Sequence, residues 1–200
     1  MIYTGNYKNC LKGHLVSISG DRGKSAGFNG PSFSPLAPKL SFWKAWYNSI
    51  GRIPDDINNY HYIRQYYEQV LKHLDPNDII NYFIDETILL NYEYNTELCH
   101  RHIVAYWLER NLGIKVEEVK VDEMGNITIL DRPTWIKEVL DEIILNDDLK
   151  TVAKDSQEKQ LVKKLSYCDY NLDFFKKCTE RKWWNWKNRN YWRRLVILQV

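Results

Sequence analysis

The chain alternates short apolar runs with longer segments in which apolar residues recur every three or four positions. Apolar runs at 2–4, 15–19 and 87–92 predict β-strands. The last of these, TILLNY, is short and nearly continuous in apolar residues, which is typical of a buried central strand. Two further runs, on either side of residues 123–126, predict a hairpin.

Between the strands, the three- and four-residue spacing predicts helices. They span residues 41–51, 58–74, 76–83, 97–112 and 133–145. Ser41 is the expected N-cap of the first helix, Asn95 or Thr96 that of the fourth, and Gly113 is the fourth helix's expected C-cap. This order favours an α/β fold, with a central, mostly parallel sheet flanked by helices and a helical C-terminal extension. We expect the α/β domain at 1–132 and the extension at 133–200.

Glycines and prolines dominate the segment 20–39, which we call the glycine-rich loop. Its first residues, GDRGKS, resemble part of a P-loop. However, Ile18 stands where that motif requires its first glycine, and glycines and a proline follow where it requires a helix. We therefore expect either a looser anion-binding loop, in which Arg22, Lys24 and Ser25 contact a ligand, or a solvated surface loop.

The junction after the 87–92 strand carries the residues best suited to chemistry. In open α/β sheets, ligands bind beyond the carboxyl ends of the strands, near the N-termini of the following helices. Here Glu93 follows the strand, and Cys99, His100 and Arg101 open the next helix. We interpret Arg101 as an anion ligand and His100 as a proton-transfer group with Glu93 as its partner. Cys99 is the candidate nucleophile.

A helical wheel separates these candidates. The predicted buried face of the helix consists of Ile103, Val104, Trp107, Leu108 and Leu112. His100, Arg101 and Glu97 point to that face, whereas His102 falls opposite and Cys99 lies toward the rim. The alternative to a ligand site is a buried His–Arg–Glu hydrogen-bond network that only holds the helix in place. We expect no metal site, since the rings of His100 and His102 do not share a face, and no cofactor.

The arrangement ILL-x-YE-x5-CHR-x5-WLE, from Ile88 to Glu109, resembles the uncharacterised family catalogued as domain of unknown function 488. The segments SIS (17–19) and LAPK (36–39) resemble its opening pattern, so that the likeness covers roughly residues 1–112. The resemblance implies an α/β fold and a shared site at the Cys-His-Arg element, with no reaction to transfer. Asn91 stands where many members carry cysteine, which argues against a paired-cysteine mechanism.

Composition excludes several classes of protein. With 44% hydrophobic and 27% charged residues, the chain is neither disordered nor collagen-like. No stretch reaches the ~20 apolar residues of a membrane span, and the N-terminus lacks a signal-peptide pattern. The four cysteines form no C-x-x-C pair and suggest no disulfide framework. A reduced, cytoplasmic protein is expected.

The net charge of +2 hides two unequal parts. Residues 176–200 carry eight basic side chains and one acid, a charge of +7, which leaves −5 on residues 1–175. The same tail holds half of the tryptophans. Interleaved cations and rings are typical of nucleic-acid contacts, although packing of the rings on the domain, a membrane surface or a protein partner remain alternatives. The candidate contacts are Arg181, Lys182, Trp183, Trp186, Arg189 and Arg193.

Two functions follow from these features. The first is an α/β enzyme that acts on a phosphate-bearing substrate, a nucleotide or a nucleic acid, through Glu93, His100 and Arg101. If the glycine-rich loop meets that helix, Arg22, Lys24 and Arg101 converge on one phosphate-like group. The second is a non-catalytic module that binds nucleic acid or protein through the basic, tryptophan-rich tail.

Overall fold

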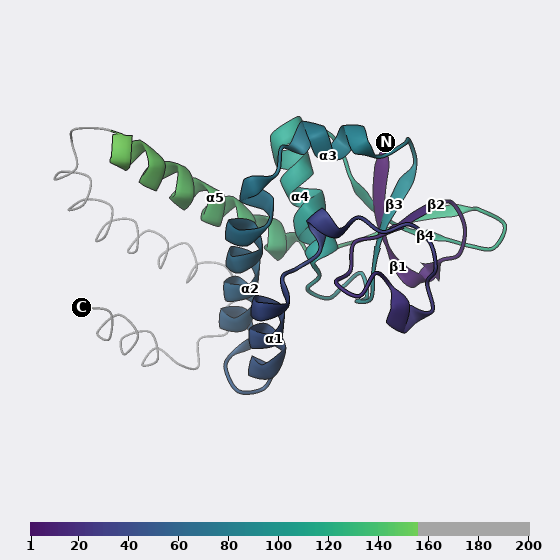
Figure 1. Cartoon of the computed structure of the whole chain (residues 1–200), viewed down its shortest axis with the longest axis horizontal. Coiled ribbons are helices and arrows are strands. Elements are labelled where there is room, and N and C mark those ends of the chain that lie inside the picture. Colours follow the sequence, from purple (N-terminus) through teal and green to yellow (C-terminus); the bar gives the residue numbers. More distant parts are fainter. Residues whose placement is uncertain (156–200) are drawn as a thin grey trace. The chain divides into compact units, whose positions relative to one another are not determined.

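The computed structural model describes residues 1–155 of the chain (Figure 1). By its internal contacts the chain divides into two units, Met1–Asn146 and Asp147–Val200, and the sheet with its packed helices belongs to the first. The tail residues from Arg181 to Arg193 lie outside the described part of the chain. Among residues 1–155, no helix has both the length and the apolar content needed to cross a bilayer.

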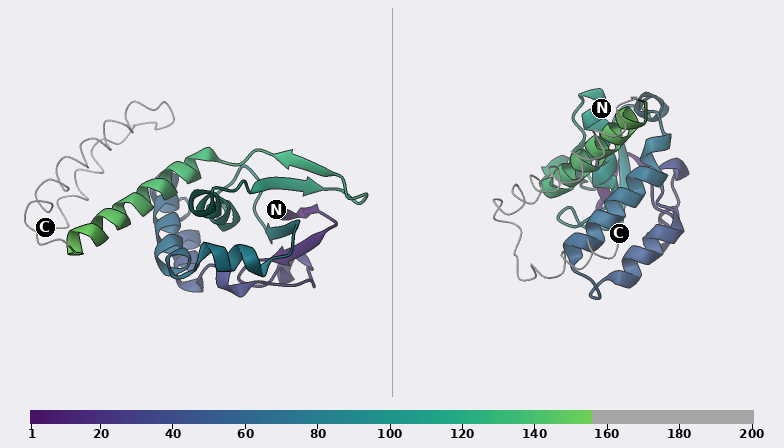
Figure 2. Two further views of the ribbon diagram at one scale, coloured as in Figure 1. Left: turned by 90° about the horizontal axis from the view of Figure 1, so that it is seen from above. Right: turned by 90° about the vertical axis from the view of Figure 1, so that its left-hand side faces the viewer.

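One sheet organises the first unit. Its strands are β1 (Ile2–Cys10), β2 (His14–Ser17), β3 (Thr87–Asn91), β4 (Glu117–Val121) and β5 (Ile127–Leu130). They lie in the order β2-β3-β1-β4-β5, and every pair is parallel except β4–β5. Figure 2 shows that antiparallel pair as two adjacent green-teal arrows, the expected hairpin. The mostly parallel α/β sheet is thus confirmed, and β3 is the predicted buried strand.

After β1 and after β3, the chain continues to strands on opposite sides of this central pair. β1 leads to β2 on the far side of β3, and β3 leads to β4 on the far side of β1. In open α/β sheets such a reversal opens a crevice at the carboxyl ends of the two strands, where ligands bind. Asn6 and Asn91 are register partners at that end.

Helices pack on one face of the sheet. They are α1 (Leu40–Ser49), α2 (Asp55–Gln69), α3 (Pro76–Tyr82), α4 (His100–Leu112) and α5 (Thr134–Asp155). Side chains from all five join Ile2 and Leu89 in the main core. Every α4 residue from His100 to Leu108 is buried, because the helix lies between the sheet on one side and α2 and α3 on the other.

A second, smaller core covers the opposite face, where Ile88 and Val119 point away from the helices. The register between β1 and β4 shifts between Gly5 and Cys10, and Cys10 packs in this second core. A Cβ on residue 5 would overlap the Sγ atom of Cys10 and approach the Val119 carbonyl. Position 5 therefore requires glycine.

Several helix ends differ from the sequence prediction. α2 spans Asp55–Gln69 where 58–74 was expected, and residues 71–73 form a separate short turn. α4 begins at His100, with Cys99 at the N-cap and no capping side chain. The reason is that Tyr94 and Glu97 close a separate turn, in which the Glu97 carboxylate accepts the Tyr94 N–H. Similarly, α1 is preceded by Lys39 at the N-cap in place of Ser41. α5 continues to Asp155, beyond the predicted end at 145.

The close approach at Gly5 gives a stability prediction. Gly5→Ala lowers the free energy of unfolding by about 1–3 kcal/mol, because the added methyl group must displace Cys10 Sγ. Urea denaturation measures this cost. Gly20→Ala is the matched control, since a Cβ there meets only the Pro38 carbonyl oxygen at 3.9 Å. Adding Cys10→Ala to Gly5→Ala should recover part of the loss, and equal costs at positions 5 and 20 would contradict the packing described.

Candidate functional site

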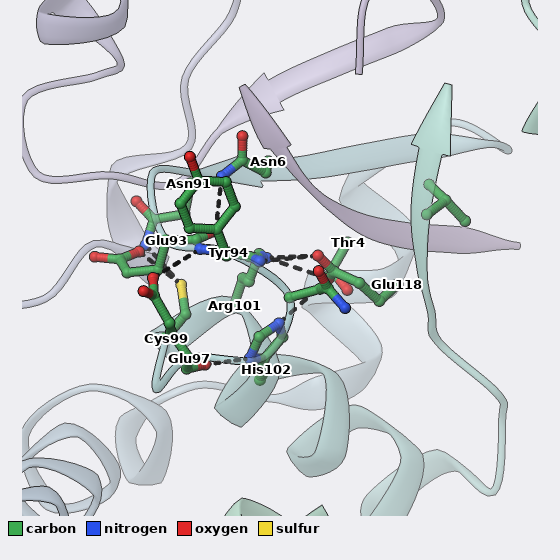
Figure 3. A network of polar contacts seen from close by, with 12 residues as sticks. Thr4, Asn6, Asn91, Glu93, Tyr94, Glu97, Cys99, Arg101, His102 and Glu118 are labelled. Atoms are coloured by element: carbon green, nitrogen blue, oxygen red, sulfur yellow. Dashed lines mark hydrogen bonds and ion pairs between the residues drawn. The ribbon is translucent and has the colours of Figure 1, made fainter. Parts of the chain in front are cut away.

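Glu93, Cys99 and Arg101 follow β3 in the chain and lie near Asn6 of β1, where the strand order reverses (Figure 3). Asn6, which is buried in the middle of β1 where its pairing with β3 ends, holds this region together. Its Nδ2 atom donates to the carbonyl oxygens of Tyr92 and Glu93, at 2.5 and 2.7 Å. The turn after β3 is therefore fixed on β1, and with it the position of the Glu93 side chain.

A directed chain of hydrogen bonds connects the reactive side chains. The Cys99 thiol donates to Glu93 Oε2 at 3.0 Å, and Asn91 Nδ2 donates to Cys99 Sγ at 2.9 Å. The same Asn91 amide lies 2.9 Å from His100 Nδ1, and His100 Nε2 lies 2.9 Å from the Ile18 carbonyl oxygen. A carbonyl only accepts, so this pattern assigns the ring proton to Nε2 and makes Nδ1 the acceptor for Asn91.

Burial sets the protonation of these groups. Desolvation raises the pKa of the Cys99 thiol well above its ordinary value, the charge of Glu93 raises it further, and Arg101 acts in the opposite direction. Desolvation lowers the pKa of His100 to about 4. At neutral pH the site therefore holds a thiol and a neutral imidazole. The proton-transfer role expected for His100 does not fit this state, because its ring orients Asn91.

Arg101 does not meet a ligand as the sequence suggested. Its Nε atom lies 3.1 Å from both carboxylate oxygens of Glu118 on β4, and one Nη atom lies 2.8 Å from Oε1. Both side chains are buried. Burial acts to raise the pKa of Glu118, but hydrogen bonds from His102 and the charge and hydrogen bonds of Arg101 lower it to about 2. Arg101 is thus neutralised inside the protein and is not available to an external phosphate.

The expected outward direction of His102 is wrong. Its ring is fully buried, with Nδ1 at 3.1 Å from the Glu97 carbonyl oxygen and Nε2 at 3.4 Å from Glu118 Oε2. The side chain of Glu97, in contrast, is exposed and caps the Tyr94 turn. A buried His–Arg–Glu network does lie at the first turn of α4, but its members are His102, Arg101 and Glu118 of β4 in place of the expected His100 and Glu97. The Cys99 cluster lies beside it.

The backbone N–H groups of the glycine-rich loop bind a carboxylate of the loop itself, that of Asp21. Asp21 accepts hydrogen bonds from the Gly23 and Ser25 backbone N–H groups at 3.0 Å each, and from the Tyr92 hydroxyl at 2.6 Å. Partial burial acts to raise the pKa of Asp21, but the hydrogen bonds from Tyr92, Ser25 and Ser19 hold it well below its ordinary value. The amides predicted to bind an external anion already bind this carboxylate.

The expected convergence of the loop with the Cys-His-Arg element is met only in part. The loop does join the end of β3, through Asp21 and Tyr92. Arg22, Lys24 and Ser25 are exposed, while Arg101 is fully buried against Glu118. The three cations therefore do not share one ligand.

Sequence reasoning missed four members of the cluster: Asn6, Asn91 as a hydrogen-bond donor, His102 and Glu118. Asn91 carried a usable signal, because an amide inside a buried apolar strand needs a partner. Glu118 carried none, because its partner Arg101 belongs to a different element.

Comparisons with protein-family models, with curated proteins and with solved structures found no match. The resemblance to domain of unknown function 488 therefore stays a prediction. Within residues 1–155, no group of three His, Cys, Asp or Glu side chains is arranged to hold a metal ion.

The internal anion of the glycine-rich loop can be tested directly. Asp21→Asn should lower the free energy of unfolding by about 1 kcal/mol at neutral pH, because charge-assisted bonds in a largely exposed site are screened by solvent. Since the folded pKa is depressed, this stabilisation is complete above the unfolded pKa of about 4 and is lost as the pH falls below it. Thermal melts across that range measure the effect. Asp131→Asn, at an exposed aspartate outside the loop, is the control, and equal costs for the two variants would refute the assignment.

Proposed function

We propose that the chain is an enzyme that acts on a phosphate-bearing substrate, a nucleotide or a nucleic acid, with Cys99 as nucleophile and Glu93 as its base. The observation that carries this proposal is the 3.0 Å contact from Cys99 Sγ to Glu93 Oε2, at the carboxyl end of β3. A nucleophile with a base in hydrogen-bond reach, oriented by a third group, is the arrangement that covalent catalysis uses. Asn6 is that third group, since it fixes the Glu93 backbone, and Asn91 donates to the sulfur itself.

The raised pKa of Cys99 decides how the thiol reacts. Because the thiol is protonated at neutral pH, attack and proton transfer occur together: Sγ bonds to phosphorus while its proton moves to Glu93. The bond from phosphorus to the leaving oxygen breaks, and that oxygen takes the proton from Glu93. Water then cleaves the sulfur–phosphorus bond, with Glu93 accepting its proton, and returns the thiol and inorganic phosphate.

Asn91 and His100 are positioning residues in this scheme. The Asn91 amide donates to Sγ, which stabilises the negative charge that grows on sulfur during attack. His100 holds that amide in place by accepting its other hydrogen, while the Ile18 carbonyl fixes the ring. Neither residue needs to change its protonation state.

Access to Cys99 passes the aromatic residues of α1. The thiol is 2% exposed, and it lines a cavity of about 10 Å³ together with Glu93, Trp43 and Trp46. That space is the size of about one water molecule. Glu93, Trp43 and Trp46 are half-buried, so displacement of the two indoles opens the cavity to a substrate.

Exposed cations support the phosphate-bearing class of substrate. Arg22 and Lys24 stand on the glycine-rich loop, whose Asp21 is bonded to Tyr92, the residue before Glu93. Because both side chains are solvated, they attract a substrate phosphate from solution more than they position it.

The proposal is tested by phosphate release from nucleoside mono-, di- and triphosphates and from single-stranded oligonucleotides that carry a terminal phosphate. Glu93→Gln should reduce kcat by about 100-fold or more, and Cys99→Ser should abolish turnover. Cys10→Ala, which removes the buried thiol on the opposite sheet face, is the matched control and should retain it. No release by the wild-type chain from any member of the panel would contradict the proposal.

Alkylation of Cys99 by iodoacetamide distinguishes a role of Glu93 as the catalytic base from a purely structural role. The charge of Glu93 raises the pKa of Cys99, so Glu93→Gln lowers that pKa and increases the thiolate fraction at pH 8. Alkylation, followed by mass spectrometry, should become faster in this variant while turnover falls. A parallel loss of both would show that Glu93 only maintains the local structure.

The second candidate is a non-catalytic module that binds nucleic acid or protein through the tail, and it is favoured by the +7 charge and the four tryptophans of residues 176–200. Truncation after residue 175 distinguishes the two functions. The enzyme proposal expects phosphate release to survive truncation, whereas the binding module loses all ligand binding.

A further inference from the structure

A larger cavity lies between α1 and α2, which run side by side (Figure 1). It has a volume of about 220 Å³ and is partly open to solvent. Its lining comprises Phe42, Ala45, Trp46, Ser49, Ile53, Asn58, His61, Tyr62 and Gln65. The cavity belongs to the first unit and includes none of the residues assigned to catalysis above.

The lining selects a flat ring without charge. Rings form much of the wall, and the centroids of Trp46 and Tyr62 are 5.3 Å apart. No lysine, arginine, aspartate or glutamate lines the cavity. Its one titratable imidazole is neutral at pH 7, because burial, aided by the charge of Arg64, lowers the pKa of His61. A charged ligand would find no counter-ion here and would lose its hydration.

Polar groups at the edge of the cavity distinguish a heteroaromatic ring from a hydrocarbon. Asn58 Nδ2 donates to the Trp46 carbonyl oxygen at 2.9 Å, which fixes the amide with its oxygen as the remaining acceptor. The Oε1 atom of Gln65 accepts a hydrogen bond from Gln69. The NH₂ group of Gln65 therefore remains as a donor. His61 adds a ring nitrogen. An occupant with both donors and acceptors on its rim matches this set.

The volume limits the occupant to a single ring system. A protein cavity of about 150 Å³ accommodates benzene. The cavity of about 220 Å³ therefore suits a bicyclic ring, and it falls below the several hundred cubic ångströms of pockets for larger ligands.

We propose that this cavity binds the neutral heteroaromatic ring of the substrate, a group of nucleobase size. Trp46 and Tyr62 line both this cavity and the small one that contains Cys99 and Glu93, so a ring bound here adjoins the reactive pair. The inference rests on the proposed function for the ligand's role as substrate. Binding of the ring itself does not depend on any reaction.

Adenine, a neutral bicyclic heteroaromatic ring, is the probe, and calorimetry on the full chain is the measurement. Ala45→Leu adds bulk at an exposed lining position of α1 without burying a polar group. It should weaken adenine binding by about tenfold or more. Asn48→Leu, at an exposed position of the same helix outside the lining, is the matched control and should leave binding unchanged.

The result expected is saturable adenine binding by the wild-type chain and by Cys99→Ser, with weaker binding of indole, which lacks the ring acceptors. No adenine binding by the wild-type chain, equal effects of the two leucine variants, or indole bound as tightly as adenine would overturn the inference. The two proposals can also fail separately. If adenine binding is lost only in Ala45→Leu while phosphate release persists in Cys99→Ser, the ring site is supported and the proposed nucleophile is refuted.

Discussion

Arg101 carries its positive charge into the interior, and the carboxylate of Glu118 on β4 neutralises it there. The pair joins the first turn of α4 to β4, so that the helix is held over β1 and β3 at a defined angle. Rotation or sliding of α4 would separate Arg101 from Glu118. Because a buried charge without its partner costs several kcal/mol, the pair holds the helix in this position. Cys99 and His100 immediately precede Arg101, and their positions follow from it.

The same turn explains why the site is arranged for a protonated thiol. Once α4 is fixed, Cys99 at its N-cap faces Glu93, and His100 reaches back to Ile18 at the end of β2. Desolvation keeps the thiol protonated and the imidazole neutral. In the proposed function, the proton to be transferred is therefore the one between Cys99 and Glu93, and Arg101 has a structural role.

Much of the architecture could be predicted from the sequence, because the strands and the long helices carry strong apolar periodicity. The mostly parallel sheet, the buried strand β3 and the glycine that ends α4 were all expected. The junction from Glu93 to Arg101 was predicted as the candidate site, and the structure brings Glu93 and Cys99 into contact there. The helical wheel failed for His102, because it assumes one solvent-facing side and α4 has none over its first nine residues. The partners Asn6 and Glu118 could not be predicted, since only the strand order brings them to the cluster.

A double-mutant cycle on Arg101 and Glu118, measured by urea denaturation, tests this account most directly. Arg101→Met and Glu118→Leu should each lower the free energy of unfolding by about 3–5 kcal/mol, because each leaves one buried charge unpaired. The double variant removes both charges and should be more stable than either single variant. Costs that simply add, so that the double variant is the least stable of the three, would contradict the claim that this pair positions α4 and the site beside it.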